Sequence, residues 1–409
     1  MSSYARFAIV FLICFFSFCC VTPAGAQKKE IQAAEDLIKS GDDKKLVQAQ
    51  QSMQTLLADS ANKRNKKIWD MLFRSYAEQY AHGNEKLYLK QKYDTVQLFN
   101  LAQNMFIVAE QLDSIEMLPD RKGRVKAEYR KEHAEILATI RPNLYNGGLY
   151  FIRKQQYDKA YSILNTYIDC TKQPMFRNKC YNTLDPKLPS AAYWAVYCAY
   201  KLKDTKAALH HVYWGLKDKQ HYEYMLQYLA EIYKLEKDTA RYVSTLDDGF
   251  KNFTGNPFFY TRLIDWYVNA GDYKKAMSYT DSLLAVKPKS VLGRFTKSTI
   301  LLNTERYSEC IPICDSLIAE NDSFPDAYIN AGLAYFNMAV KLDKNIQHLR
   351  TNKQRILQYY TKALPYLEKY RKMRPERKDQ WALPLYTIYL NMNKGKEFDE
   401  IDKIMRSQP

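Results

Sequence analysis

The chain has 409 residues, of which 46% are hydrophobic and 26% are charged, so it has enough apolar side chains to form folded domains and is not a disordered polymer. Its 61 Lys and Arg outnumber its 45 Asp and Glu, which gives a formal net charge of +16 at pH 7. Because one globular core rarely grows to this length, we expect several domains or a repeat array.

The first segment has the three-part layout of an export signal. Arg6 precedes an apolar run over residues 7–20, and Ala24 and Ala26 supply the small residues that a signal peptidase requires. We expect residues 1–26 to form a signal peptide that is cleaved after Ala26. The mature protein would then be periplasmic or secreted.

Two alternatives to a cleaved signal are less favoured. The apolar run is shorter than the roughly 20 residues that a membrane-spanning helix needs, and Cys19 and Cys20 lack the small preceding residue of a lipid-attachment site. We therefore expect no transmembrane segment, and outer-membrane attachment is the minor alternative. For an exported chain, the positive charge points to acidic proteins, phospholipid head groups or acidic glycans, and not to nucleic acid.

Residues 27–140 have helical periodicity but irregular spacing. The stretch "KIWDMLFRSYAEQY" carries apolar residues three and four positions apart, and "YDTVQLFNLAQNMFIVAEQL" continues the pattern as a longer helix. We interpret this region as atypical N-terminal helical repeats that run into the region after residue 140.

A period of 34 residues governs the rest of the chain, residues 141–409. Counted in one frame, units begin near Pro189, Glu223, Pro257, Val291 and Pro325. A fixed period of this length is typical of a solenoid, in which each unit buries its apolar face only by stacking on its neighbours.

The unit from Pro257 shows how each repeat is built. Pro suits the first position of a helix, where its missing N–H costs no hydrogen bond. Gly271 suits the left-handed residue that ends this helix, and Asp272 can cap the next one. Ala276 then allows the two helices to approach closely, and Pro288 ends the pair.

This combination resembles the tetratricopeptide repeat (TPR) family. Small residues occupy the family's close-contact positions at Gly148, Ala230, Gly332, Ala160, Ala208, Ala276 and Ala363, and aromatic residues occupy its packing positions at Phe151, Tyr157, Tyr233, Tyr267, Tyr273, Tyr307 and Tyr335. The resemblance implies an all-α, right-handed α-solenoid of stacked TPR-like helix pairs. The chain also resembles exported bacterial TPR proteins whose role is undefined.

Two insertions interrupt the period. The first, near residues 169–188, reads as a loop, and its Cys170 and Cys180 could form a disulfide in an oxidising compartment. The second, near residues 341–360, is polar and lacks helix breakers, so we expect both helices of that unit to lengthen into a protruding hairpin.

The sequence offers no catalytic or cofactor-binding motif. Neither a nucleophile elbow nor a phosphate-binding glycine loop is present, and the histidines and cysteines lack metal-ligand spacing. We expect Cys198, Cys310 and Cys314 to be buried thiols and His210, His211 and His221 to be surface residues. We therefore expect no enzyme, no cofactor and no metal.

The resemblance to TPR proteins implies a scaffold that binds a protein or peptide segment in a concave groove. The residues expected on that face are Phe258, Thr261, Asp265, Phe295, Ile329, Leu333, Phe336, Tyr386 and Tyr389. An alternative left open is that some of them only pack between neighbouring repeats. The family's clamp for a free C-terminal carboxylate is not filled in this sequence.

A second hypothesis uses the positive charge. Residues 341–378 hold 12 Lys and Arg against three acidic residues. A basic patch there, with Arg350, Lys353, Arg355, Arg371, Lys372 and Arg374, would bind a polyanion, a membrane surface or a glycan.

Overall fold

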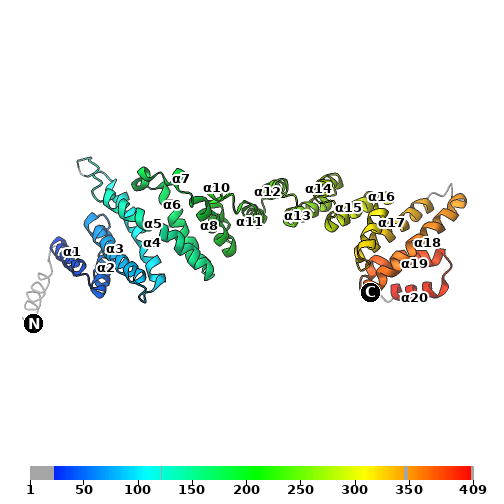
Figure 1. The fold of residues 1–409 in the computed structure, drawn as a ribbon, viewed down its shortest axis with the longest axis horizontal. Helices are drawn as coiled ribbons and strands as arrows, with labels where there is room; N and C mark the ends of the chain where they lie inside the picture. The colour runs from blue at the N-terminus through cyan, green and yellow to red at the C-terminus, as the bar shows by residue number, and fades with distance from the viewer. Residues whose placement is uncertain (1–22, 121, 345–348, 407–409) are drawn as a thin grey trace, which may run out of the picture. The chain divides into compact units, whose positions relative to one another are not determined.

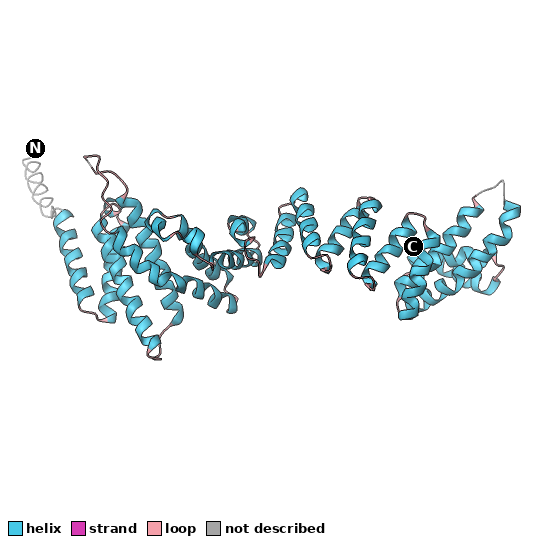
Figure 2. Ribbon diagram, turned by 45° about the horizontal axis from the view of Figure 1, so that its top comes forward, coloured by secondary structure: helices cyan, strands magenta, loops and turns pink. Residues whose placement is uncertain are grey.

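The computed structural model of the chain describes residues 23–120, 122–344 and 349–406, and for residues 23–26, 349 and 350 it describes the backbone alone. Within these ranges all regular structure is helical and no strand occurs, which confirms the all-α class (Figures 1 and 2). Residues 1–22 of the expected signal peptide lie outside the described residues. The chain divides into two compact units after Tyr228, and each is described by itself.

The first unit is a row of helices in which each packs against the next along the chain. Its α-helices are α1 (Pro23–Lys39), α2 (Asp43–Ala58), α3 (Lys66–Tyr88), α4 (Thr95–Glu116), α5 (Arg130–Arg153), α6 (Tyr157–Asp169), α7 (Tyr181–Leu184), α8 (Leu188–Leu202), α9 (Thr205–His210) and α10 (Val212–Gly215). One hydrophobic core runs from Ile31 to Cys198. The irregular N-terminal region therefore shares its core with the helices that follow.

The boundary that the sequence placed between residues 140 and 141 falls inside α5. This helix contains Pro142, which is exposed and therefore lies on the face away from the core. On the other face Leu137, Ile140 and Leu144 are all buried, so the apolar stripe continues across the proline. Burial of that stripe keeps the helix intact.

The insertion at residues 169–188 is more ordered than the predicted loop. It folds into two short 3₁₀ helices, η2 (Cys170–Lys172) and η3 (Pro174–Lys179), followed by α7. Met175 and Phe176 are buried, and the Phe176 ring lies 5.7 Å from that of Phe106 on α4. These two apolar side chains fix the insertion against the core.

The second unit contains the regular repeats. Helix α11 (Tyr222–Leu235) crosses the division, and the others are α12 (Thr239–Asn252), α13 (Pro257–Asn269), α14 (Tyr273–Val286), α15 (Val291–Asn303), α16 (Tyr307–Glu320), α17 (Pro325–Asp343), α18 (Leu349–Met373), α19 (Lys378–Asn391) and α20 (Gly395–Arg406). The helices α13, α15 and α17 begin at the predicted residues, and α8 and α11 begin within one residue of them. The 34-residue repeat of TPR-like helix pairs is confirmed.

The turn between α13 and α14 has the predicted chemistry. Gly271 has a φ of +72°, and the Asp272 carboxylate accepts a hydrogen bond from the Lys275 amide at 3.0 Å. Ala276 is fully buried, and a Cβ added to Gly148 in the first unit would lie 2.4 Å from Leu164. Small residues therefore occur where two helices come closest.

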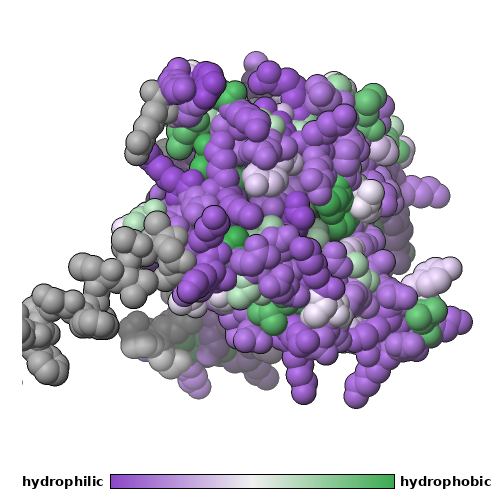
Figure 3. Space-filling model, turned by 90° about the vertical axis from the view of Figure 1, so that its left-hand side faces the viewer, coloured by the Kyte–Doolittle hydropathy of each residue, from purple (hydrophilic) through white to green (hydrophobic). Residues whose placement is uncertain are grey.

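The helix pair that holds the 341–360 insertion consists of α17 and α18, which are the longest described helices of the second unit. Residues 345–348 at the tip of this pair lie outside the described residues. None of the helices in the described ranges combines the length and the apolar character that crossing a membrane requires. On the face drawn in Figure 3, hydrophilic side chains predominate and apolar ones form small scattered areas.

Candidate functional site

Two of the nine predicted groove residues belong to the core. Ile329 is 6% exposed and Tyr389 is 2% exposed, and the Tyr389 hydroxyl donates to Glu368 Oε1 at 2.9 Å. The prediction that these two line a groove is wrong, because both fill the space between neighbouring helices.

Several of the other predicted residues are half-buried against aromatic neighbours. Phe336 lies with its ring 6.0 Å from that of Tyr360, and Tyr386 lies 4.7 Å from Phe398. Phe295 likewise packs edge-on against Phe324. Leu333 packs against the hydrophobic core that α17, α18, α19 and α20 form together. Packing within and between the helix pairs therefore uses much of the apolar surface that the sequence assigned to a partner.

The described surface has a cleft where α11, the start of α12 and α13 meet, and we call it the α11–α13 cleft. Its volume is about 290 Å³. The side chains that define its chemistry are Tyr233, Lys237, Tyr242, Arg262, Asp265 and Trp266. Trp266 is 38% exposed, so a large aromatic surface faces solvent.

Hydrogen bonds and ring contacts hold the floor of this cleft. Arg262 forms an ion pair with Glu231 at 2.8 Å, and its guanidinium lies 3.6 Å from the centre of the Phe258 ring. Burial raises the pKa of Tyr242, so its hydroxyl stays neutral. Of the predicted groove residues, Asp265 lines the cleft and Phe258 supports it from beneath Arg262.

Sequence reasoning missed Trp266 and Tyr242. Trp266 directly follows Asp265, but its exposure depends on how much of α13 the neighbouring helices cover, and no local pattern encodes that. Thr261 was predicted to face a partner, yet its hydroxyl donates to the Pro257 carbonyl within its own helix at 2.8 Å.

The predicted basic patch is divided between the two ends of α18. Lys353 and Arg355 are exposed in its first turns, whereas Arg371 and Lys372 lie in its last turn. At 1.5 Å per residue, Arg355 and Arg371 are about 24 Å apart along the helix. The single patch is therefore corrected to two separate groups. The Arg350 side chain lies outside the described part of the chain.

The C-terminal group is also partly neutralised. Arg371 pairs with Glu400 on α20 and lies 5.0 Å from the ring of Trp381, and Arg374 lies 3.7 Å from Glu376. The Arg371 contacts tie α18 to α19 and α20, and the two ion pairs leave less free positive charge than the sequence indicates.

The predicted bond between Cys170 and Cys180 is not formed, since both are free thiols. Cys170 is buried, accepts from Arg141 Nε at 3.2 Å and donates to the Tyr167 carbonyl, whereas Cys180 is exposed. The core holds one sulfur while the other lies on the surface. Cys198, Cys310 and Cys314 are buried as predicted.

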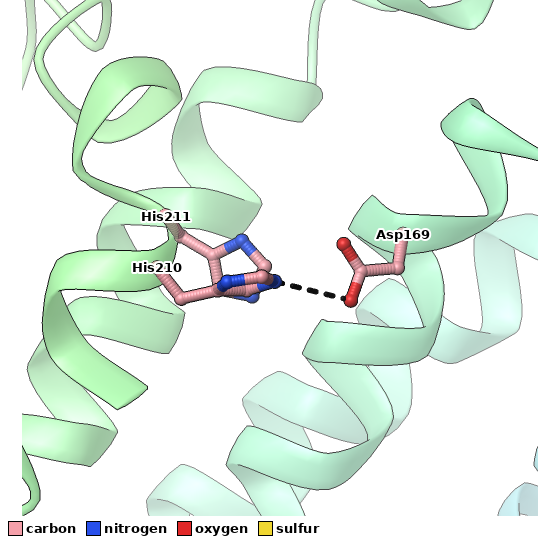
Figure 4. Close-up of side chains that lie close together, drawn as sticks. All are labelled: Asp169, His210 and His211. Atoms are coloured by element: carbon pink, nitrogen blue, oxygen red, sulfur yellow. Dashed lines mark ion pairs between the residues drawn. The ribbon is translucent and has the colours of Figure 1, made fainter. Parts of the chain in front are cut away.

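The structure brings two histidines and a carboxylate together at the surface of the first unit (Figure 4). The ligand-type atoms of Asp169, His210 and His211 lie within 4.8 Å of one another, and His210 Nε2 is 3.4 Å from Asp169 Oδ2. His211 is only 1% exposed, so the prediction that it is a surface residue is wrong. Burial lowers its pKa to about 4, which keeps the imidazole neutral.

A second carboxyl group, that of Glu110, lies beside this cluster. Burial first, and then the charge of Asp169, raise the pKa of Glu110 to about 7. Its Oε1 is buried without a hydrogen-bond partner among the described atoms. No sequence pattern indicates this grouping, because Glu110 and His211 are 101 positions apart.

No protein-family model and no curated protein matches the chain. Solved structures that resemble it include the C-terminal part of a TPR repeat-containing protein from Cytophaga hutchinsonii, with 14% identity, a TM-score of 0.42 and coverage of 63% of this chain and 93% of that one. A TPR protein from Parabacteroides merdae has 15% identity, a TM-score of 0.35 and coverage of 65% and 99%. YrrB, described as a TPR protein with an unusual peptide-binding site, has 15% identity, a TM-score of 0.35 and coverage of 53% and 97%.

Proposed function

We propose that the chain is a non-catalytic scaffold that binds a protein segment in the α11–α13 cleft. The observation that carries this proposal is the partly exposed Trp266 in the α11–α13 cleft. The charged residues that line this cleft are held in place mainly by the helices α11 and α13. Aromatic side chains on rigid elements make strong anchors, because little conformational freedom is lost when they are covered.

The charges of the cleft select the chemistry of the segment. Lys234 and Lys237 line it, against Asp265 as the one acidic lining residue, while the third cation, Arg262, is already paired with Glu231. A partner segment should therefore carry Asp or Glu next to an aromatic or branched aliphatic side chain. The carboxylate would meet the lysines while the apolar side chain covers Trp266.

The test is a selection of peptides from a random displayed library against the immobilised full chain, followed by affinity measurement through fluorescence anisotropy. Enriched peptides should combine an acidic with an apolar residue, and Trp266→Ala should weaken their binding at least tenfold. Leu383→Ala is the matched control, since Leu383 is 60% exposed on α19, outside the cleft. Peptides that bind the Trp266→Ala variant as tightly as the parent would refute the proposal.

The alternative hypothesis, binding through the basic residues of 341–378, predicts a different dependence of binding on salt. If Lys353, Arg355 and Lys372 recruited a polyanion, a membrane surface or a glycan, then binding would fall steeply with salt, because exposed charges are screened over about 8 Å at physiological ionic strength. The ion pairs of Arg371 and Arg374 favour the cleft instead. Binding to vesicles that contain anionic lipid, compared between the parent chain and the Lys353→Glu/Arg355→Glu variant, distinguishes the two hypotheses.

We also propose that the protein is exported with residues 1–26 removed. Support comes from the charged, apolar and small-residue segments of that stretch. Intact-mass measurement of the protein recovered from its native host should give a chain that begins at Gln27. A chain that retains Met1, or a lipid on Cys19 or Cys20, would contradict this.

A further inference from the structure

We propose that Asp169, His210 and His211 form a binding site for a divalent transition metal of the zinc type. Two imidazoles and one carboxylate are a ligand set that Zn²⁺ uses in proteins. Among the described residues, this is the one group of three or more His, Cys, Asp or Glu with ligand-type atoms close enough to hold an ion.

A break in the helix makes this convergence possible. Neighbouring residues of a continuous helix point about 100° apart and do not face the same partner. Here α9 ends at His210, and His211 has φ −111° and ψ 8° before α10 begins at Val212. Both imidazoles can therefore approach Asp169, the last residue of α6 (Figure 4).

The distances are close to those that a metal requires. Zinc binds nitrogen and oxygen at about 2.0–2.2 Å, so two ligand atoms in a tetrahedral site lie roughly 3.3 Å apart. His210 Nε2 and Asp169 Oδ2 are already 3.4 Å apart, and the widest separation in the group is within 4.8 Å. A small side-chain rotation would bring the most widely separated ligand atoms to the spacing of a tetrahedral site.

The surrounding groups orient the ligands. His211 Nε2 lies 2.8 Å from Asn165 Oδ1, and in the tautomer that donates a hydrogen there, Nδ1 is the nitrogen that keeps a lone pair for a metal. Lys172 holds the other oxygen of Asp169 at 2.6 Å. Metal-binding histidines commonly donate their second nitrogen to such an oxygen, which fixes the ring.

A further carboxyl group, that of Glu110, lies near the site. Gln103 on α4 donates to Ser162 and Thr166 on α6 at 2.8 and 3.1 Å, and Glu110 and Asp169 follow Gln103 and Ser162 by seven residues each. Two helical turns thus place Glu110 beside Asp169. Its Oε1 is buried without a hydrogen-bond partner among the described atoms, but Glu110 is not one of the three residues whose ligand-type atoms lie within 4.8 Å of one another.

The site is open to an entering ion. The His210 side chain is 49% exposed and that of Asp169 is 28% exposed, whereas His211 lies behind them in the core. Solvent therefore reaches two of the three ligands directly.

Titration with Co²⁺ tests the site, because a d–d absorption in visible light reports its coordination. The tag-free full chain, stripped with a chelator, should bind one Co²⁺ and release it to Zn²⁺. Asp169→Asn and His210→Ala should each weaken binding at least 100-fold. His82→Ala, at a solvent-accessible histidine paired with Asp43, should leave binding unchanged.

Circular dichroism confirms that each variant is folded, so that a loss of binding reports the ligands and not the fold. Absence of Co²⁺ binding to the parent chain would overturn the inference. One-to-one binding that both Asp169→Asn and His210→Ala leave intact would overturn it as well. The cleft proposal is independent of either result, because that cleft lies in the second unit.

Discussion

Arg141 and Asp185 form an ion pair inside the first unit, with 2.6 Å between Nη1 and Oδ2 and with both side chains less than one-tenth exposed. The same guanidinium donates to the Tyr167 carbonyl at 3.1 Å and stacks on the rings of Tyr167 and Tyr181 at 3.7 and 4.0 Å. This pair joins α5 to the end of the 169–188 insertion and explains why that insertion is ordered.

Replacing Arg141 by Met should therefore destabilise the first unit by about 3–5 kcal/mol, because the buried Asp185 carboxylate loses its only ion-pair partner among the described residues and keeps only neutral hydrogen-bond donors. Urea denaturation, followed by hydrogen exchange of peptides from α5 and α6, measures this. The matched control is Arg124→Met, which breaks an exposed pair with Asp120 and should change stability by less than about 1 kcal/mol. Equal losses of unfolding free energy in the two variants would show that the buried pair stabilises the protein no more than the exposed pair does.

Cysteine accessibility distinguishes the folded arrangement from a disulfide. Burial raises the pKa of both Cys170 and Cys198 to about 12, so neither forms the reactive thiolate near neutral pH, whereas Cys180 is exposed. Of the five cysteines after residue 26, iodoacetamide should label Cys180 alone until the protein is unfolded. Peptide mapping without reductant checks this, and a linked Cys170–Cys180 peptide would contradict it.

Any side chain at Gly249 should lower the stability of the second unit. A Cβ at this position of α12 would lie 2.2 Å from the ring of Phe259, which is fully buried on α13. Gly249→Ala should therefore destabilise the second unit by about 1–3 kcal/mol, even though Ala favours helix. At Gly395 nothing lies within 4 Å, so Gly395→Ala should be neutral or slightly stabilising. Thermal unfolding of the two variants should therefore separate them clearly; similar midpoints would reject the packing argument.

The two neighbouring cations at the end of α18 should behave differently. Arg371 pairs with Glu400 and covers Trp381, whereas Lys372 is exposed. Arg371→Glu should destabilise the C-terminal helices by about 2 kcal/mol through loss of both contacts and repulsion from Glu400. Lys372→Glu should change stability by less than about 0.5 kcal/mol. Hydrogen exchange in α18–α20 measures both, and a larger effect of Lys372 would contradict the assignment.

The sequence alone determined the repeat architecture. Helix starts near Pro257, Val291 and Pro325 follow from proline, capping residues and apolar spacing, which act within a few positions of one another. The turn at Gly271 and Asp272 follows for the same reason. Local chemistry of this kind needs no knowledge of how the helices pack.

Only the tertiary structure decided what each surface residue does. Ile329 and Tyr389, which were predicted to line a groove, are buried in the core, because exposure depends on which neighbouring helix covers a side chain. The residues of the predicted basic patch lie in two separate groups. The cluster of Asp169, His210 and His211 depends on a contact across 41 positions. Helical periodicity specifies which face of a helix is buried, but the crossing of separate helices places side chains from distant positions together.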